Sequence, residues 1–268
     1  MTQARWFGPL LFTALVTALL FLILPVVAIF VDTGPGELLA TLDDPAAVDA
    51  LTLSLWTSAL AVAIIVVVGT PAAYLLATRS FRGRSVVITL IELPLVLPPA
   101  VAGIGLLAAL GPNGLIGDSL DDAGVRVVLT TASVVLALTF VAAPFYLRQA
   151  EAAFSALDRT WLEASRTLGA GEATTFAQVA IPAALPGLIA GLALAWGRAL
   201  GEFGATLMFA GSFRGVTQTV PLAIYERFAT DFTAALGLSA VLVAVSAAIL
   251  LTVKLATHAS PARVLAPR

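Results

Sequence analysis

The sequence predicts an all-α fold, a polytopic membrane helix bundle with six transmembrane helices. Hydrophobic residues make up 60% of the chain, charged residues only 11%, and the mean hydropathy is +1.02, whereas about a quarter of the residues of a typical soluble domain are charged. A helix needs roughly 20 apolar residues to cross a hydrocarbon core of about 30 Å. None of the apolar runs alternates as a barrel strand does, so the spans should be helices that pair their own amides.

Six apolar runs reach this length, and we expect them to form a single domain over residues 1–268. They lie at about residues 9–31, 51–77, 86–110, 127–147, 183–210 and 232–255. The first run resembles a signal peptide, but it is longer than the 7–15 apolar residues of such a segment. No small-x-small cleavage site precedes Asp32. The first run is therefore expected to be a transmembrane helix.

Charge sets the expected orientation, because Lys and Arg mark the cytoplasmic side of a membrane protein. The turn after the second span carries Arg79, Arg82 and Arg84, whereas residues 32–49 carry five acids and no base. With the N-terminus inside, ten Lys and Arg residues are cytoplasmic and three are outside. We therefore expect a multi-pass protein of the plasma or inner membrane with both termini cytoplasmic. Residues 163–182 fall on the same side.

The sequence contains no catalytic or metal-binding constellation. It has no cysteine, which excludes disulfides and thiolate metal sites. The lone His258 is interpreted as a solvated side chain. A Gly-Lys-Ser/Thr phosphate loop, a Ser/His/Asp set and a His/Glu metal spacing are all missing. We therefore expect no enzymatic activity, no cofactor or metal bound by this chain and no nucleic-acid partner, and any energy must come from another protein.

A polar, glycine-rich segment lies between the fourth and fifth spans, where a short turn would join them. It reads EASRTLGAGEATTFAQVAIP, residues 163–182. A helix lying on the lipid surface is the alternative, but such a helix carries Lys and Arg on its polar face. From Arg148 to Glu172 there are four acids and three bases. The segment therefore favours contact with a protein.

This segment predicts a cytoplasmic helix-turn-helix loop over residues 154–182. The first helix should cover residues 154–167, and Gly169 and Gly171 should end it, because glycine readily adopts the left-handed turn that follows a helix. A second helix over residues 172–179 should lead to Pro182. The first helix has two candidate N-caps, Asp158 and a capping box of Thr160 with Glu163. Apolar contacts are expected from Leu162, Ala164 and Leu168.

The spacing of this segment resembles the cytoplasmic loop by which permeases of binding-protein-dependent ABC importers dock onto their ATPase. The matching positions are Glu163, Ala164, Ser165, Gly169, Val179, Ile181 and Pro182. Ser165 replaces a second Ala, and Val179-x-Ile181 replaces the commoner Ile-x-Leu, with size and polarity preserved. The resemblance implies that the ATPase-coupling residues are Glu163, Ala164, Ser165, Gly169, Ala170, Gly171 and Pro182.

Three further segments are similar to the molybdate-type permease subunit of sulfate, molybdate and tungstate transporters. They are LPLVLPPAVAGIGLL at 93–107, GRALGEFGATLMFAG at 197–211 and TQTVPLAIY at 217–225. The resemblance implies transport of molybdate, with tungstate as a second candidate, received from an extracytoplasmic binding protein. It also implies a second permease copy in a homodimer, and two ATPase subunits that bind ATP and Mg²⁺.

Two alternatives remain open. Sulfate or thiosulfate import, usually by two related permease chains, is the nearer one. The remote one is a secondary transporter driven by an ion gradient, with Arg198 and Glu202 as the coupling pair. A secondary transporter is expected to show inverted repeats with corresponding broken spans, and we recognise none in the two halves of the sequence.

Arg198 and Glu202 lie in the fifth span, four residues apart and so on one helical face. Each alone would cost roughly 2.5–3.5 kcal/mol near the bilayer centre, so they should pair and turn away from lipid. We favour a structural pair, and a place in the anion pathway or gate is the alternative. Glu92, at the cytoplasmic end of the third span, is a candidate helix cap.

Pro98 and Pro99 interrupt the third span, because proline removes amide donors and kinks helices. They make this span a pathway candidate, with a kink that serves only packing as the alternative. Outside, Thr217, Gln218 and Thr219 offer uncharged donors for a gate, although an ordinary polar loop is favoured. The outer segments carry ten acids and three bases, which repel a dianion within the Debye length. Capture from solution is therefore assigned to a separate binding protein.

Overall fold

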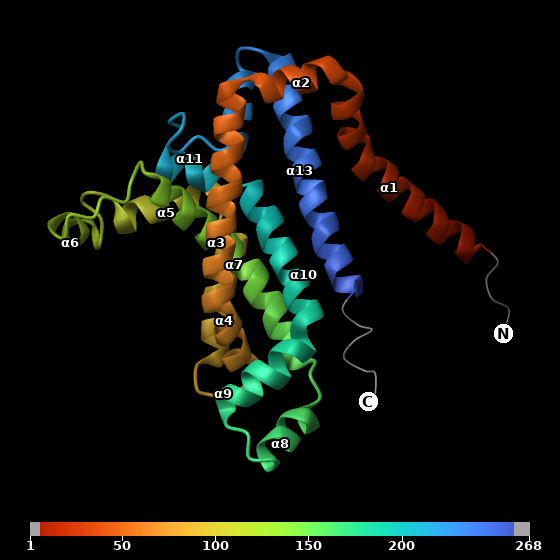
Figure 1. Ribbon diagram of the computed structural model, residues 1–268, viewed down its shortest axis with the longest axis vertical. Helices are drawn as coiled ribbons and strands as arrows, with labels where there is room; N and C mark the ends of the chain where they lie inside the picture. Colours follow the sequence, from red (N-terminus) through yellow and green to blue (C-terminus); the bar gives the residue numbers. More distant parts are fainter. Residues whose placement is uncertain (1–5, 260–268) are drawn as a thin grey trace.

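The computed structural model describes residues 6–259, and the elements in this range are helices (Figure 1). Five helices are long and apolar enough to cross a membrane: α1 (Phe7–Asp32), α3 (Pro45–Thr78), α7 (Thr131–Ser155), α13 (Phe232–Ala259), and α9 (Glu172–Thr175) continued through the π-helical turn η1 (Phe176–Ala180) into α10 (Ile181–Leu200). A sixth span results if α4 (Arg84–Val96) and α5 (Pro99–Leu110), bent by 116° at their junction, count as one. The all-α membrane fold is confirmed.

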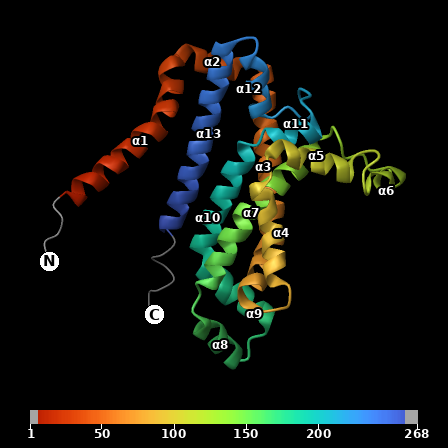
Figure 2. The same ribbon diagram turned by 180° about the vertical axis from the view of Figure 1, so that it is seen from behind.

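Short helices occupy the two ends of the bundle. The end drawn uppermost in Figure 1 carries α2 (Pro35–Asp43) and α12 (Val220–Phe228), and the opposite end carries α8 (Arg159–Thr167) beside α9. Two arms project sideways in opposite directions, one formed by α1 and the other by α5 with α6 (Gly117–Asp122), as the view from behind also shows (Figure 2). Three of the ten residues predicted to be cytoplasmic, Arg5, Arg263 and Arg268, lie outside the described residues.

The centre of the bundle is the contact of α7 with α3 and α10. A Cβ atom added at Gly187 would lie 2.4 Å from the Ala153 Cβ, and one at Gly191 would lie 3.1 Å from the Gln149 Cβ. Tyr146 of α7 is 1% exposed, and its ring lies against both Gly69 of α3 and Gly191 of α10. Small residues therefore let the three backbones approach closely, which is how helices associate in lipid.

The third span is sharply broken rather than kinked. Residues 86–110 form α4 and α5, and the chain between them, Leu97 and Pro98, has extended ψ values of 129° and 135°. A proline disfavours helical geometry at the preceding residue and supplies no amide hydrogen. Consecutive prolines at 98 and 99 therefore end one helix and start another in a new direction.

The fifth span differs from the expected residues 183–210 at both ends. The predicted second helix over residues 172–179 is present as α9 and η1, but it continues through Pro182 into α10 without a turn. The π-helical turn η1 lies directly before Pro182, and its wider ladder tolerates a residue that donates no hydrogen bond. The span also ends early, at Leu200, and α11 (Gly204–Ala210) follows after a break.

The helices that follow the two breaks pack against each other. A Cβ atom at Gly103 of α5 would lie 2.6 Å from the Ala205 carbonyl oxygen of α11, and one at Gly204 would lie 2.9 Å from the Pro99 Cβ. The two breaks do not occupy corresponding places in the two halves of the chain, because the first divides the third span and the second follows the fifth span. Those breaks do not share a sequence signal, because prolines cause the first and no proline lies at the second.

An ion pair closes the outer end of the bundle. Asp44 caps α3 by accepting a hydrogen bond from the Ala46 amide at 2.9 Å, and it also pairs with Arg227 of α12. The Arg227 guanidinium, and after it the Ala46 amide, lower the pKa of the Asp44 carboxyl below its usual value. Asp44 is therefore ionised at neutral pH, where it joins the start of α3 to the end of α12.

We predict that Gly103→Val lowers the unfolding free energy by about 1–3 kcal/mol, the usual range for overpacking a close contact. The added side chain would push α5 away from the Ala205 carbonyl. Gly105→Val, two residues along the same helix where a Cβ meets nothing within 4 Å, is the matched control. Thermal unfolding of both variants in detergent measures the difference, and equal midpoints would contradict the close α5–α11 contact.

Candidate functional site

The cytoplasmic knob, defined as residues 156–175, begins with a side-chain cap. The Asp158 carboxylate accepts a hydrogen bond from the Thr160 amide at 2.9 Å, and this bond lowers the pKa of the Asp158 carboxyl. The predicted start of the first helix at residue 154 is wrong, since α7 continues to Ser155 and α8 begins only at Arg159, directly after the Asp158 cap. Asp158 is thus the cap, and the alternative capping box of Thr160 with Glu163 is wrong, since Thr160 lies inside the helix.

The turn after α8 depends on one glycine. Gly169 has φ of +87°, and its amide donates to the Arg166 carbonyl at 2.9 Å while the Ala170 amide donates to the Ser165 carbonyl at 3.1 Å. This is the Schellman arrangement that ends many helices. Gly171 has φ of −67° and precedes α9 in extended geometry. Only the first of the two glycines therefore needs a left-handed backbone.

The knob is held by an internal hydrogen bond, by burial of Leu162 in the core and by aromatic contacts at its base. The Ser165 and Thr175 hydroxyls are 3.0 Å apart, which joins α8 to α9, and Leu162 is 8% exposed. At the base of the knob, the Tyr74 ring lies 5.3 Å from the Phe154 ring and 4.8 Å from the Phe176 ring, measured between centroids. The knob is therefore packed at both of its ends, against α7 and against the start of the fifth span.

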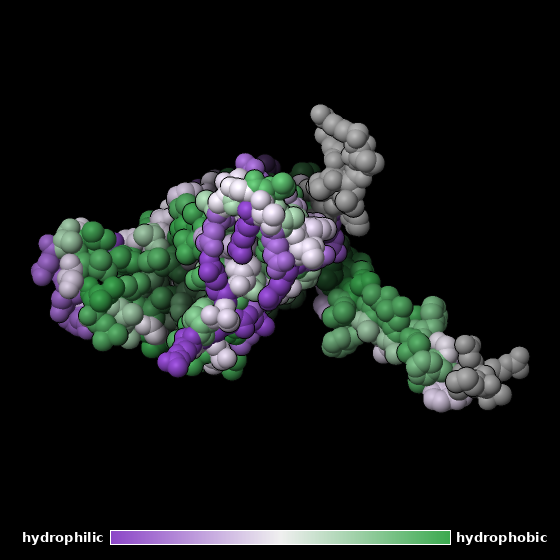
Figure 3. Space-filling view, turned by 90° about the horizontal axis from the view of Figure 1, so that it is seen from below, coloured by the Kyte–Doolittle hydropathy of each residue, from purple (hydrophilic) through white to green (hydrophobic). Residues whose placement is uncertain are grey.

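The exposed surface of the knob combines charged residues with an apolar stripe. Seen from below, hydrophilic residues gather at this end of the molecule, between the two apolar arms (Figure 3). Trp161, Ala164 and Leu168 follow the three- and four-residue spacing of one helical face, and Trp161 is 52% and Leu168 88% exposed. Of the three residues expected to supply apolar contacts, Leu162 is buried, whereas Ala164 and Leu168 are exposed. Glu163 and Pro182 are also exposed.

Ion pairs join the knob to the turn between α3 and α4. Arg79 of this turn pairs with Glu172 at the start of α9, and Arg166 of α8 lies 3.9 Å from the same carboxylate. Arg79 and Glu172 are 93 residues apart in sequence. Sequence reasoning missed them, although the cluster of arginines after the second span was a signal that charges gather there.

The intramembrane charges form the expected pair at the second helix break. The Arg198 Nη2 and Glu202 Oε2 atoms are 2.5 Å apart, and the Glu202 side chain is 1% exposed against 26% for Arg198. The other Glu202 oxygen accepts a hydrogen bond from the Ala205 amide at 2.7 Å, in the first turn of α11. Glu202 therefore holds the end of α10 and the start of α11 together.

The outer residues Thr217, Gln218 and Thr219 are buried, with exposed fractions of 0%, 7% and 3%. The expectation of a solvated polar loop is wrong. The Thr217 hydroxyl accepts a hydrogen bond from the Phe213 amide at 2.9 Å, and the Gln218 amide group donates to the Glu226 carboxylate. These side chains hold the loop between α11 and α12 in place, and composition gave no signal of their burial.

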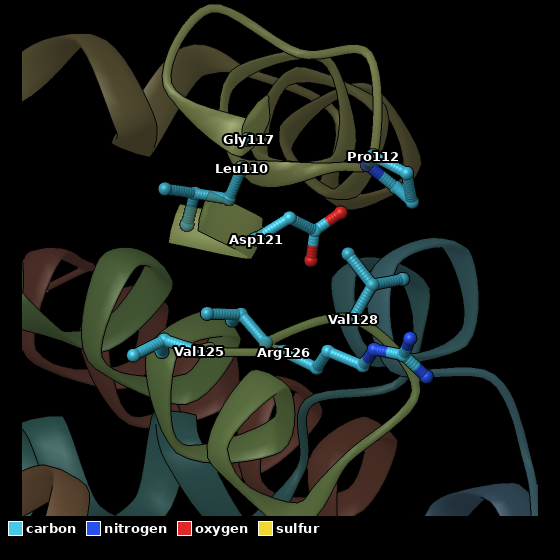
Figure 4. Close-up of a pocket in the computed structure, with 8 residues that line it drawn as sticks. Leu110, Pro112, Gly117, Asp121, Val125, Arg126 and Val128 are labelled. Carbon is cyan, nitrogen blue, oxygen red and sulfur yellow. The ribbon is translucent and has the colours of Figure 1, made fainter. Parts of the chain in front are cut away.

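An outer cavity of about 280 Å³ lies between the α5–α6 arm and the segment that leads into α7 (Figure 4). The Asp121 carboxylate points into it, and Arg126 lies along the opposite wall. A carboxylate inside the cavity disfavours an anion. Within residues 6–259, His, Asp and Glu side chains form no group of three that could hold a metal ion.

The predicted site residues thus form three separate groups. The predicted coupling residues Glu163 to Gly171 lie together on the knob, with Pro182 beyond it in α10, and Thr217, Gln218 and Thr219 lie in the loop before α12. Pro98, Pro99, Arg198 and Glu202 lie at the two breaks, which meet where Pro99 contacts Gly204. Glu92 is not a helix cap, because its carboxylate lies 2.8 Å from the Arg148 Nε atom.

Comparison with known proteins gives the family. Residues 66–264 match the family described as binding-protein-dependent transport system inner membrane component. The molybdenum transport system permease protein ModB of Mycobacterium tuberculosis is 44% identical over 240 residues, 89% of this chain and 90% of that protein. The protein of the same name from Escherichia coli K12 is 39% identical over 182 residues, 68% of this chain and 80% of the relative.

A solved structure shares the fold. The crystal structure of a bacterial ABC transporter involved in the import of the acidic polysaccharide alginate contains a chain with a TM-score of 0.72 and 17% identity, covering 96% of both chains. The chain therefore belongs to the family of inner membrane components of binding-protein-dependent transport systems, the multi-pass, non-catalytic permease subunits that act with an ATPase and a binding protein.

Proposed function

We propose that this chain is the membrane-spanning subunit of an ATP-driven importer of molybdate. The observation that carries the proposal is the 44% identity to the ModB permease of Mycobacterium tuberculosis over nearly the whole chain. The segments 93–107, 197–211 and 217–225, which resemble oxyanion permeases, lie at or next to the two helix breaks. Tungstate, a dianion of the same tetrahedral shape, is a second cargo, and sulfate is the rival.

We propose a complex of two copies of this chain, two ATPase subunits and one extracytoplasmic oxyanion-binding protein. One docking knob per chain and one ATPase per knob account for the subunit numbers. The acidic outer surface supports delivery by a binding protein rather than capture from solution, because like charges repel the dianion. Bilayer lipid surrounds the remaining apolar surface.

The knob is proposed as the surface that docks onto the ATPase. Its apolar stripe of Trp161, Ala164 and Leu168 is exposed at the cytoplasmic end, where no lipid covers it. Exposed aromatic and aliphatic side chains flanked by charges are typical of protein interfaces. The Ser165–Thr175 contact and the aromatic cluster below it give the knob the rigidity that a lever requires. Glu163 supplies a charged contact beside the stripe.

The Arg198–Glu202 pair is proposed as a structural anchor of the broken fifth span. The two Glu202 oxygens are directed at Arg198 and at the Ala205 amide. The Arg198 cation is therefore neutralised by Glu202 in this conformation and does not attract a passing anion. Pro98 and Pro99 are proposed to shape the pathway by directing α5 onto α11. Thr217, Gln218 and Thr219 are buried, so their proposed part in an outer gate requires this loop to open.

Gly169→Val is predicted to abolish stimulation of the ATPase by the binding protein. A β-branched residue at φ of +87° is strained by about 1–3 kcal/mol, and the turn between α8 and α9 would deform. Gly124→Val has a similar positive φ of +74° and open space in the outer loop, so it should keep coupling. The measurement is ATP hydrolysis by the complex in reconstituted vesicles. Normal coupling in the Gly169→Val variant would contradict the proposal that the knob transmits movement as a rigid lever.

For Arg198 and Glu202, we predict that single neutral variants are less stable than the double variant. Arg198→Gln leaves a buried carboxylate unpaired, at a cost of roughly 3–5 kcal/mol, whereas the Arg198→Gln/Glu202→Gln protein has no charge to desolvate. Thermal stability in detergent and molybdate uptake are both measured. A double variant that regains stability but does not transport molybdate would show that the pair acts in the anion pathway and is not only structural.

The cargo is tested by ATP hydrolysis of the reconstituted complex with its binding protein loaded in turn with molybdate, tungstate or sulfate. We expect stimulation by molybdate and tungstate. Stimulation by sulfate alone would overturn the proposed cargo while leaving the family unchanged. Uptake that needs no ATP and collapses with a protonophore would instead support the secondary-transporter alternative.

A further inference from the structure

Four charged side chains join α4 to α7 on the cytoplasmic half of the bundle, and we call them the charge latch. The Arg84 Nη2 atom lies 2.8 Å from the Glu151 Oε1 atom, and the Arg148 Nε atom lies 2.8 Å from the Glu92 Oε1 atom. Arg148 also pairs with Glu151. The order Arg84, Glu151, Arg148, Glu92 alternates positive and negative charge, so the latch is neutral as a whole.

Apolar packing of α4 is weak by comparison. None of its thirteen residues is buried in the described chain, and Val86 and Leu90 are each 61% exposed. At one end lies Gly83, with φ of +87°, and at the other the 116° bend at Pro98. Helix α4 is therefore a short, straight segment between two bends. Ion pairs to α7 hold it at Arg84 and at Glu92.

The latch divides into two neutral halves. Glu92 and Arg84 belong to α4, eight residues apart, and Arg148 and Glu151 belong to α7, three residues apart. If α4 moves away, the α7 pair remains intact, so the nearly buried Glu151, 11% exposed, keeps a partner. The α4 charges are 36% and 39% exposed and can be hydrated. Opening therefore strands no buried charge, which is the main cost of breaking such contacts.

We propose that the charge latch holds α4 against α7 in one conformation and opens during each transport cycle, with α4 turning about the break at Pro98. This inference rests on the proposed function, because ATPase movement must reach the membrane. Helix α7 leads directly into the knob through residues 156–158. Movement of the knob therefore acts first on the helix that carries Arg148 and Glu151.

The first test is Glu92→Gln, which removes the more exposed link and leaves the Arg148–Glu151 pair. We expect ATP hydrolysis without binding protein to rise by about two- to fivefold, the change that corresponds to loss of one partly exposed ion pair. Glu92→Asp, which keeps the negative charge, should bring basal hydrolysis most of the way back to the wild-type rate. Arg82→Gln, in the neighbouring turn and outside the latch, should behave as the wild type. Wild-type basal hydrolysis in Glu92→Gln would contradict the latch.

A cross-link provides the second test, because the chain has no cysteine of its own. In the Glu92→Cys/Arg148→Cys variant, joining the two thiols with a reducible bifunctional reagent would prevent α4 and α7 from separating. We expect loss of binding-protein-stimulated hydrolysis and of uptake, with recovery after reduction. Full activity of the cross-linked protein would overturn the latch. Absence of stimulation in the wild type with every oxyanion would instead contradict the proposed function.

Discussion

Close packing of α7 between α3 and α10 supports the rest of the structure. Lipid tails are as apolar as leucine side chains, so burial alone does not hold membrane helices together. Here Gly187 and Gly191 bring α10 onto α7, and Gly69 brings α3 onto the Tyr146 ring of the same helix. The functional features begin from this contact: α7 runs into the knob, carries half of the charge latch and contacts α11 beside the second break.

Charges are placed so that each charged group inside the bundle has a specific partner. Arg198 and Glu202 neutralise each other at the break after α10, and Asp44 and Arg227 do so at the outer end. The latch repeats this arrangement on the cytoplasmic half. A chain that passes an oxyanion has reason to avoid isolated arginines along the way, because an unpaired cation in a medium of low dielectric constant would hold the anion tightly.

Local sequence was enough wherever a residue's conformation depends on its neighbours. Gly169 was expected to leave the helix because no side chain resists the left-handed turn there, and Asp158 was among the expected caps. The existence of the five long spans follows from apolar length alone, although the structure moves several of their ends from the expected residues. The break at Pro98 was expected as a kink, but its 116° angle depends on where α5 packs, and that requires Gly103 to meet the Ala205 carbonyl about a hundred residues later.

The sequence by itself determined an all-helical membrane protein, its expected orientation, the glycine turn of the knob and the permease family that the chain resembles, because hydropathy, charge asymmetry and turn chemistry act over a few residues. Only the tertiary structure decided that Thr217 to Thr219 are buried, that Leu168 is exposed, that Glu92 meets Arg148, and that the two broken spans touch. Each of these depends on helices distant in sequence, whose contacts are set by the close approach of small residues.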